Sequence, residues 1–492
     1  MKNYSYLCIW KNELILFTMR RILTAVTFLF ASATVTMAGG LMTNTNYHIA
    51  FDRMMARGAS SEIDAAYSNP AGLVWGYEGF QLSLNFQKPW QNRDVNLTAP
   101  NYLAVPALGY GGVDIDKKFA GKASAPIVPA LFASYKQDRW AVSAMLGIVG
   151  SGGYVKYDDG IPMFNALVMA KLFQSTLSSP AALGGPMTPE KYNIDSEMEG
   201  KQYIYGGQLN FSYKLTDNLS AALGVRANYY DGYNRGHVTA ITTETLGSQK
   251  LIDLQLDCLQ KGWGFTPIVG FNYHEGPLTI ATRYEFRTKI NPENETKELS
   301  ATIKNTDPKT AGAMPYISGA MALEQFGDKV TPYKDGEKTR YDMPALLSIA
   351  IGYEFTDDFR ATLEYHNFDD KNAKMAGGRQ KELTHGTDEF LLGLEYDINE
   401  KFTISCGGQR TDYGLDDDYQ QNTSFACDSW SFGLGGAWNI TEKIRLNAGY
   451  FCTLYQDYTK NYANGYQGTP WNAKEVYSRT NHVIGMGIDY KF

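Results

Sequence analysis

Residues 483–492, Val-Ile-Gly-Met-Gly-Ile-Asp-Tyr-Lys-Phe, end the chain and decide its fold. Apolar and aromatic side chains occupy alternate positions from Ile484 to Phe492, and glycine, aspartate and lysine occupy the positions between them. Since side chains on a strand alternate between its two faces, one face of this segment is apolar and the other is polar or open. A soluble protein seldom ends in this way. The ending predicts the closing strand of a barrel whose outer face meets lipid.

The composition fits a membrane barrel or a soluble β protein. The chain holds 34 Tyr and 48 Gly, and aromatic residues make up 13% of its 492 positions, which is typical of strands and membrane interfaces. After residue 38, no apolar run reaches the roughly 18 residues that a membrane-spanning helix needs. The formal net charge of −7 argues against a nucleic-acid partner.

Residues 1–38 predict a signal peptide, with Met1 or Met19 as the start. Met19-Arg20-Arg21 is basic, residues 22–35 are mostly apolar, and Thr36-Met37-Ala38 is similar to a cleavage site. A single membrane anchor is the alternative, although the apolar stretch is short for a spanning helix.

Residues 78–492 predict an all-β domain, a transmembrane antiparallel β-barrel. Apolar and polar residues alternate in segments near the length of about ten residues that a tilted barrel strand needs. We count about fourteen such strands. Their centres are 80–86, 127–136, 140–149, 203–213, 219–229, 265–273, 278–286, 345–355, 359–365, 390–398, 402–406, 430–440, 444–454 and 484–492.

Short and long connections alternate strictly between these strands. The short ones are 136–139, 216–218, 274–277, 356–358, 399–401 and 441–443. The long ones lie near 88–126, 150–200, 231–261, 288–341, 367–387, 412–427 and 456–478. This order predicts short periplasmic turns, long external loops, and both chain ends on the periplasmic side.

The two faces of the predicted strands differ in chemistry. Aromatic residues stand at many outward ends and fit an interfacial girdle: Tyr213, Phe286, Tyr353, Phe355, Trp430 and Trp438. Polar residues stand at inward positions and would line the lumen: Gln208, Asn210, Arg226, Asn228, Arg283, Glu285, Glu364, Glu395 and Asp397.

Residues 39–77 precede the first strand and are the natural candidate for a hatch that plugs the lumen. A barrel of about fourteen strands is too wide to be filled by its own side chains. A disordered periplasmic tail is the alternative. The segment is rich in apolar residues such as Phe51, Leu73 and Trp75, which argues against free disorder.

Part of this segment carries a family resemblance. Residues 58–73, GASSEIDAAYSNPAGL, resemble the hatch of the FadL-type outer-membrane transporters (the OMPP1/FadL/TodX family), and Asn69-Pro70-Ala71 matches that family's NPA motif. Residues 262–265, Pro344 and the closing residues 490–492 are also similar to family patterns. That ending further resembles the signal that barrel assembly machinery reads. The resemblance covers the whole mature chain.

The resemblance implies a monomeric barrel with no cofactor, placed in the bacterial outer membrane in contact with lipid and lipopolysaccharide. FadL-type proteins carry hydrophobic compounds, such as long-chain fatty acids or aromatic hydrocarbons, inward without an energy source. The ligand meets an apolar surface among the outer loops and then a pocket in the upper barrel. A hatch shift and a sideways opening release it into the bilayer, where burial recovers ~0.8 kcal/mol per CH₂.

Asn69, Pro70 and Ala71 are predicted to anchor the hatch. Pro70 lacks an N–H and biases Asn69 toward extended backbone, while the Asn69 amide can bond nearby backbone. An ordinary Asn-Pro turn is the alternative.

Gly150, Gly152 and Gly153 follow the predicted strand 140–149. Glycines at a strand end mark a kink or a bulge. The resemblance implies that this third strand breaks to form the lateral gate. A flexible start of the next loop is the alternative.

The loop that follows is too apolar for a solvated external loop. A short helix there would present an adaptable apolar surface. Phe164, Leu167 and Phe173 are therefore predicted to form a groove through which ligand enters. The alternative is a lid that folds over the barrel mouth.

Three other functions compete with transport of hydrophobic compounds. An outer-membrane lipase-type enzyme would need a catalytic site, but none of the six histidines lies in a nucleophile motif, and His366 beside Glu364 reads as a polar contact in the lumen. A general diffusion porin would need an open lumen, which a hatch contradicts. A transporter driven from the inner membrane has about 22 strands and a larger plug. No metal site is expected from the cysteine spacings.

Overall fold

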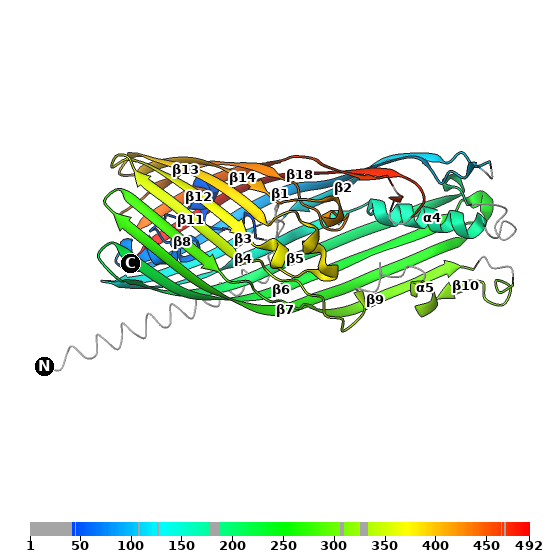
Figure 1. Ribbon diagram of the computed structural model, residues 1–492, viewed down its shortest axis with the longest axis horizontal. Helices are drawn as coiled ribbons and strands as arrows, with labels where there is room; N and C mark the ends of the chain where they lie inside the picture. The colour runs from blue at the N-terminus through cyan, green and yellow to red at the C-terminus, as the bar shows by residue number, and fades with distance from the viewer. Residues whose placement is uncertain are drawn as a thin grey trace.

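The computed structural model shows a closed antiparallel β-barrel (Figure 1). It describes residues 42–44, 46–106, 109–124, 127–177, 187–305, 309–324, 333–463, 465–466 and 469–492. The predicted signal peptide lies outside the described residues. None of the helices in these ranges is long and apolar enough to cross a membrane.

The wall has fourteen strand positions. Three of these positions are each formed by two strands that follow one another in the chain. The wall consists of β1 (Gly79–Tyr102), β2 (Val113–Ser124) with β3 (Val128–Gln137), β4 (Trp140–Tyr157), β5 (Tyr192–Lys214), β6 (Leu219–Thr242), β7 (Lys250–Glu275), β8 (Leu278–Glu285) with β9 (Glu293–Lys304), β11 (Leu346–Glu354), β12 (Phe359–Phe368), β13 (Thr387–Asn399), β14 (Phe402–Asp412), β15 (Ser429–Asn439), β16 (Ile444–Tyr455) with β17 (Tyr458–Tyr462), and β18 (Ala473–Lys491). Each predicted strand is present. A short strand, β10 (Tyr316–Ser318), adds to β9.

The first and last strands close the barrel. β1 pairs with β18 in one continuous register from Gln81 opposite Lys491 to Thr98 opposite Lys474. The other edge of β1 pairs with β3 and, higher up, with β2. The final residue takes part in the closure, since the Phe492 N–H donates to the Phe80 carbonyl over 3.0 Å.

The outer face is apolar and the inner face is polar, as the alternation predicted. On β18, Ile484, Met486 and Ile488 are exposed, while Gly485 and Gly487 face inward against the N-terminal segment. All six predicted girdle aromatics are exposed on the outer face. The predicted lumen residues are buried, except for Asp397, which is half-buried.

The six short turns are confirmed, but the long connections were predicted too long. Residues 88–102 continue β1, and residues 231–242 and 250–261 belong to β6 and β7. The connection between β6 and β7 therefore has seven residues, 243–249. Figure 1 shows β5, β6 and β7 running far beyond the shorter strands β11 to β14.

These extensions escaped prediction because their outer face is charged. Lys201 lies 2.6 Å from Asp231, and Arg235 lies 2.9 Å from Asp257. An apolar outer face is required only where a strand meets hydrocarbon. Above that level the alternation disappears although the hydrogen-bonded ladder continues.

Helix α4 (Pro162–Leu177) packs inside the extended part of the wall. Its Val168 and Leu172 join a buried apolar cluster with Val238 and Leu251 of the extended strands. The remaining short elements lie in the connections: α5 (Ala320–Glu324), η4 (Pro189–Lys191), η5 (Glu244–Leu246), η8 (Asp370–Asn372), η9 (Ala376–Glu382) and η10 (Asp417–Tyr419).

The hatch, residues 46–76, lies inside the barrel. It contains α2 (Ile49–Met54), α3 (Ala65–Ser68) and η1 (Pro70–Trp75), and α2 and α3 are buried throughout. α2 contacts β13 to β16 and β18, and η1 contacts β5 to β7. The prediction of a plug, and not a free tail, is confirmed for these residues.

α2 rests on a glycine cradle, defined here as inward-facing glycines on five neighbouring strands. The cradle consists of Gly393, Gly407, Gly433, Gly449 and Gly485. A Cβ on Gly433 would lie 2.5 Å from the Asp52 carbonyl oxygen, and one on Gly393 would lie 2.6 Å from Met54 Cγ. The helix therefore seats only because this part of the wall has no side chains.

We predict that Gly407→Ala unseats α2, because the new Cβ would overlap the Met54 carbonyl oxygen. Overpacking of this kind costs about 1–3 kcal/mol. Limited proteolysis within residues 46–76 should become faster. Gly408→Ala is the matched control, because its Cβ would lie 3.7 Å from the nearest atom. Equal proteolysis of both variants would contradict the cradle.

Candidate functional site

The predicted hatch motif is bonded to the wall through Asn69. The buried Asn69 side chain donates from Nδ2 to Asn272 Oδ1 on β7 over 2.8 Å, and to the Ser60 carbonyl over 3.1 Å. A Cβ on Gly72 would lie 2.5 Å from Asn69 Nδ2. Asn69 therefore joins the wall to the middle of the hatch.

Pro70 and Ala71 present their carbonyl groups to the wall. The Ser212 hydroxyl on β5 donates to the Pro70 oxygen, and the Ser220 hydroxyl on β6 donates to the Ala71 oxygen, each over 2.7 Å. Asn210 Nδ2 donates to the Ala66 carbonyl over 2.9 Å. Hydroxyl and amide groups on inward-facing positions thus hold the motif and Ala66, and the Arg283 guanidinium on β8 donates to the Tyr67 carbonyl.

The opposite side of the hatch is held by charges. On α2, Arg53 forms a buried ion pair with Glu395 on β13. Arg57 Nε lies 2.7 Å from Asp64 Oδ2, and its Nη2 lies 2.7 Å from Glu62 Oε2. Burial alone would raise the pKa of Glu62, but the cations Arg445 and Arg57 hold this pKa well below its usual value.

Asp52 is a buried carboxyl of the hatch with one hydrogen bond from the wall. Its Oδ1 accepts from Gln87 Nε2 over 2.7 Å. Burial raises the pKa of Asp52 well above its usual value. The neutral acid is therefore the form that fits inside the barrel.

β4 turns inward at the predicted glycine segment. Its register with β5 shifts between Ile148 and Gly150 and again between Ser151 and Gly153. Gly153 has a φ of 84°. Residues 147–151 are all buried, whereas a strand on the lipid face alternates. Gly150, Gly152 and Gly153 thus lie in two successive bulges and not in a loop.

The wall is weakly joined beside these bulges. β4 pairs with β3 as far as Leu146, and with β2 only at Lys156 and Tyr157. Between those points, the described residues of β4 form no ladder with β2 or β3. A side opening at this place would break few hydrogen bonds.

The three predicted groove residues all lie in α4, but they differ in position. Phe164 is half-buried, and Phe173 is fully buried with its ring 5.6 Å from Tyr110 and 6.0 Å from Trp471. The side chain of Leu167 lies outside the described part. Phe173 therefore fixes α4 to the loops, which is the arrangement expected of a lid.

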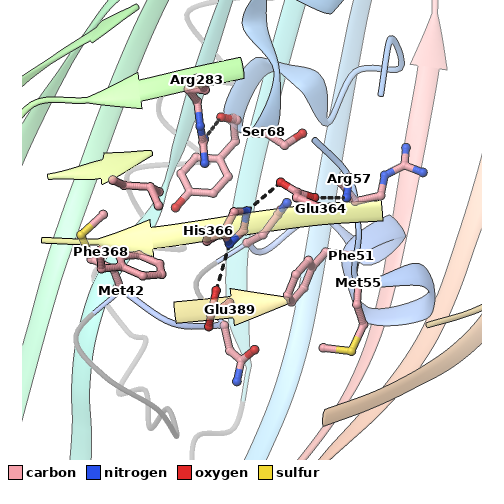
Figure 2. Close-up of a pocket in the computed structure, with 14 residues that line it drawn as sticks. Met42, Phe51, Met55, Arg57, Ser68, Arg283, Glu364, His366, Phe368 and Glu389 are labelled. Carbon is pink, nitrogen blue, oxygen red and sulfur yellow. Dashed lines mark hydrogen bonds and ion pairs between the residues drawn. The ribbon is translucent and has the colours of Figure 1, made fainter. Parts of the chain in front are cut away.

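Three cavities follow one another along the barrel. A cavity of about 650 Å³ lies beside α4 and is lined by Met169, Phe119 and Ile194. A cavity of about 720 Å³ lies above the hatch, and its lining combines four aromatic rings with two arginines and two aspartates: Tyr341, Tyr413, Tyr419, Phe425, Arg93, Arg379, Asp342 and Asp370. The third, of about 420 Å³, borders the hatch itself (Figure 2). The four aromatic rings suit an apolar ligand, or the apolar part of a ligand that also carries a charge.

His366 is a polar contact of the wall, as predicted. Its Nε2 lies 2.7 Å from Glu364 Oε1, and its Nδ1 lies 2.9 Å from Glu389 Oε2 (Figure 2). Both ring nitrogens are used in this way. Within the described residues, no group of three or more His, Cys, Asp or Glu side chains is placed to hold a metal ion.

The comparisons with known proteins address the fold. No family model and no curated protein matches the chain. A FadL homologue from Pseudomonas aeruginosa superposes with a TM-score of 0.63 at 13% identity, over 92% of this chain and 100% of that one. The chain has the FadL-type fold. The toluene transporter TodX of Pseudomonas putida superposes with a TM-score of 0.52 at 15% identity, over 91% and 99% of the two chains.

Within this FadL-type barrel, the sequence identified the hatch motif but not all of its partners. Asn210 was predicted to face the lumen, and it does. Ser212, Ser220 and Asn272 were missed, because small polar residues at inward positions give no signal of what they bond. The cradle was missed for a similar reason, since the glycines meet only when neighbouring strands are in register.

We predict that Asn69→Ala lowers the free energy of unfolding by about 1–3 kcal/mol, because the Asn272 acceptor and the Ser60 carbonyl lose their donor. Urea unfolding in detergent micelles measures this change. In an Asn272→Ala background the same substitution should cost less. Equal costs in both backgrounds would show that the two side chains are not coupled.

We also predict a pH-dependent effect of Asp52→Asn. A raised pKa means that the folded state favours the protonated acid, so the stability of the wild type rises as the pH falls through that pKa. The variant should be more stable than the wild type at pH 8, by about 1.4 kcal/mol for each unit of the shift. The difference should vanish at acidic pH. A constant difference would contradict the burial argument.

Proposed function

We propose that this protein carries hydrophobic compounds, such as long-chain fatty acids or aromatic hydrocarbons, inward across the bacterial outer membrane. One observation carries the proposal: a fourteen-strand barrel holds a seated hatch below a cavity to which four aromatic rings contribute. A wide barrel would otherwise be a water-filled pore. A closed lumen with an aromatic binding cavity suits compounds that water-filled pores serve poorly.

The solved proteins that share the fold support this reading. Their descriptions name a FadL homologue and a toluene transporter. Transport of an apolar ligand down its gradient needs no energy source, because the gradient itself supplies the free energy.

We propose a path that uses the sites predicted from sequence. Ligand enters at α4 beside Phe164 and Leu167, with Phe173 holding the helix in place, and then occupies the aromatic cavity. Asn69, Pro70 and Ala71 keep the hatch anchored below it. Gly150, Gly152 and Gly153 form the lateral gate, through which the ligand leaves into the bilayer. The double bulge and the missing ladder beside β4 support this exit.

The proposal includes the setting of the protein. Residues 1–38 act as a signal peptide, barrel assembly machinery recognises the closing strand, and a monomer lies in contact with outer-membrane lipid and lipopolysaccharide. The exposed apolar band and its aromatic girdle support a membrane position.

Two rival functions fit the structure less well. A general diffusion porin needs an open lumen, and the hatch contacts strands on opposite sides of the barrel. An outer-membrane lipase-type enzyme needs an available base, whereas His366 has both ring nitrogens engaged by glutamates.

The direct test is uptake of labelled oleate and labelled toluene by cells with and without the protein. Uptake should require the protein and should fall in an Asn69→Ala, Pro70→Ala double variant, because the hatch loses its anchor. Uptake of neither compound would contradict the proposal. Passage of small sugars through the wild type would instead favour a porin.

We predict that Phe164→Ser with Met169→Ser lowers uptake while the heat stability of the barrel stays unchanged. Both side chains are half-buried on α4, and Met169 lines the outer cavity. Phe173→Ser is the comparison variant, and it should loosen α4 because two ring contacts are lost. Unchanged uptake in the double variant would reject the groove.

A further inference from the structure

A turn of the hatch separates two cavities. Arg57 lines the cavity of about 420 Å³ on the upper side of the hatch. Ser61 and Glu62 line another cavity, of about 630 Å³, which also touches Thr441 and Lys443 in a short turn at the periplasmic end. The hatch turn, defined as residues 57–62, is therefore a partition between the lumen and the periplasmic end.

The hatch turn is stiffened by its own side chains. Arg57 binds Asp64 and Glu62, and Ser60 Oγ donates to Asp64 Oδ1 over 2.8 Å. These contacts lie within the hatch, so they stiffen the turn without tying it to the wall. Asn69 donates to the Ser60 carbonyl, which ties the end of the turn to the anchored motif.

One wall side chain, Glu364 of β12, holds the backbone of the hatch turn. Its Oε2 accepts from the N–H of Arg57 over 2.9 Å (Figure 2) and from the N–H of Gly58 over 2.8 Å. A Cβ on Gly58 would lie 2.5 Å from Glu364 Oε1. The turn can reach this carboxylate because residue 58 is glycine.

The other oxygen of Glu364 is held by the wall. Oε1 accepts from Ser348 Oγ over 3.0 Å and pairs with His366 Nε2, while Glu389 binds the opposite nitrogen of His366. Hydrogen bonds to an ionised carboxylate are about twice as strong as neutral ones. Side chains on β11, β12 and β13 thus orient Glu364 so that its other oxygen faces the hatch.

The two cavities beside the hatch turn carry both apolar and charged side chains. Phe51, Met55 and Phe368 give the upper cavity apolar walls, and Glu364 and His366 give it a polar side. The lower cavity is lined largely by charged and polar residues: Glu62, Gln81, Glu442, Lys443, Arg445, Asp489 and Lys491. A passage through both would suit a small molecule with an apolar body and a charged group.

We propose that the hatch turn is a second gate, latched by Glu364, through which small charged amphiphiles such as aromatic carboxylates pass to the periplasm. Releasing the two N–H groups from Glu364, together with the Glu62 carboxylate from Arg445 of β16, lets the turn swing about Asn69 and joins the two cavities. α2 stays in the glycine cradle, and the motif stays on β5 to β7. Sideways release serves uncharged compounds and long-chain fatty acids, because a long apolar chain gains more from burial in hydrocarbon than its charged group loses. A small charged amphiphile has too little apolar surface for the same exit. This inference rests on the proposed transport function.

Two engineered disulfides distinguish a moving turn from a fixed one. Ala59→Cys with Gly352→Cys joins the turn to β11, where a Cβ on residue 352 would lie 2.8 Å from the Ala59 Cβ. Ala71→Cys with Gly270→Cys joins the motif to β7, where the corresponding distance is 3.9 Å. A disulfide needs a Cβ separation of about 3.5–4.5 Å. The first pair therefore requires the turn to shift slightly.

The probes are labelled benzoate and labelled toluene, taken up by porin-deficient cells that produce each variant. Oxidation of the 59–352 pair should abolish benzoate uptake and leave toluene uptake unchanged, and reductant should restore benzoate uptake. Oxidation of the 71–270 pair should leave both uptakes at the level that the same variant shows under reductant, because the motif does not move. Benzoate uptake that survives the 59–352 cross-link would overturn the second gate, as would its loss with the 71–270 cross-link. If wild-type cells take up benzoate but not toluene, the proposed transport of hydrophobic compounds is rejected, while the second gate is not.

The latch can be measured without any transport. Hydrogen exchange of the peptide covering residues 55–62 should become faster in Glu364→Ala, because the N–H groups of Arg57 and Gly58 lose their acceptor. The peptide covering residues 69–76 should be unaffected. Ser220→Ala is the matched control, and it should affect the second peptide only. Unchanged exchange of residues 55–62 in Glu364→Ala would overturn the latch, whatever the uptake results.

Discussion

The structure depends on one constraint: in hydrocarbon, every backbone N–H and C=O must find a partner within the protein. A sheet meets this demand only by closing on itself, and here β1 and β18 close it along one unbroken register. Phe492, the last residue, still donates its N–H to β1. Closure at fourteen strand positions then sets the width of the lumen, and that width creates the need for a hatch.

Filling the lumen imposes opposite demands on the two sides of the wall. Toward β13–β18 the wall gives up side chains so that α2 can approach, as at Gly433 and Gly449. Toward β5–β8 it offers hydroxyls and amides to the hatch carbonyls. Buried charges such as Arg53 and Glu364 are tolerated because each has a fixed partner. The hatch is therefore a fitted component and not a loosely packed segment.

The sequence predicted those features that lipid or turn chemistry imposes locally. Outward residues such as Trp430 and Leu392 must be apolar, so strand centres and short turns were correctly predicted. The extensions of β6 and β7 were not, because above the bilayer their outer face is charged, as at Arg235 and Asp257. The Asn69-Pro70-Ala71 segment was recognised by resemblance. The Glu364 contact with the hatch turn was not, since it joins residues some 300 positions apart. Such contacts follow from register, which alternation alone does not supply.

In this protein a seated hatch closes a barrel that is wide enough to be a pore. Ion conductance of the purified wild-type protein in a planar lipid bilayer is the direct test of this closure. Insertion of the protein should produce no steady current, because the hatch occupies the lumen and contacts the wall from β5 on one side to β18 on the other. A steady, porin-sized current from the intact protein would contradict it.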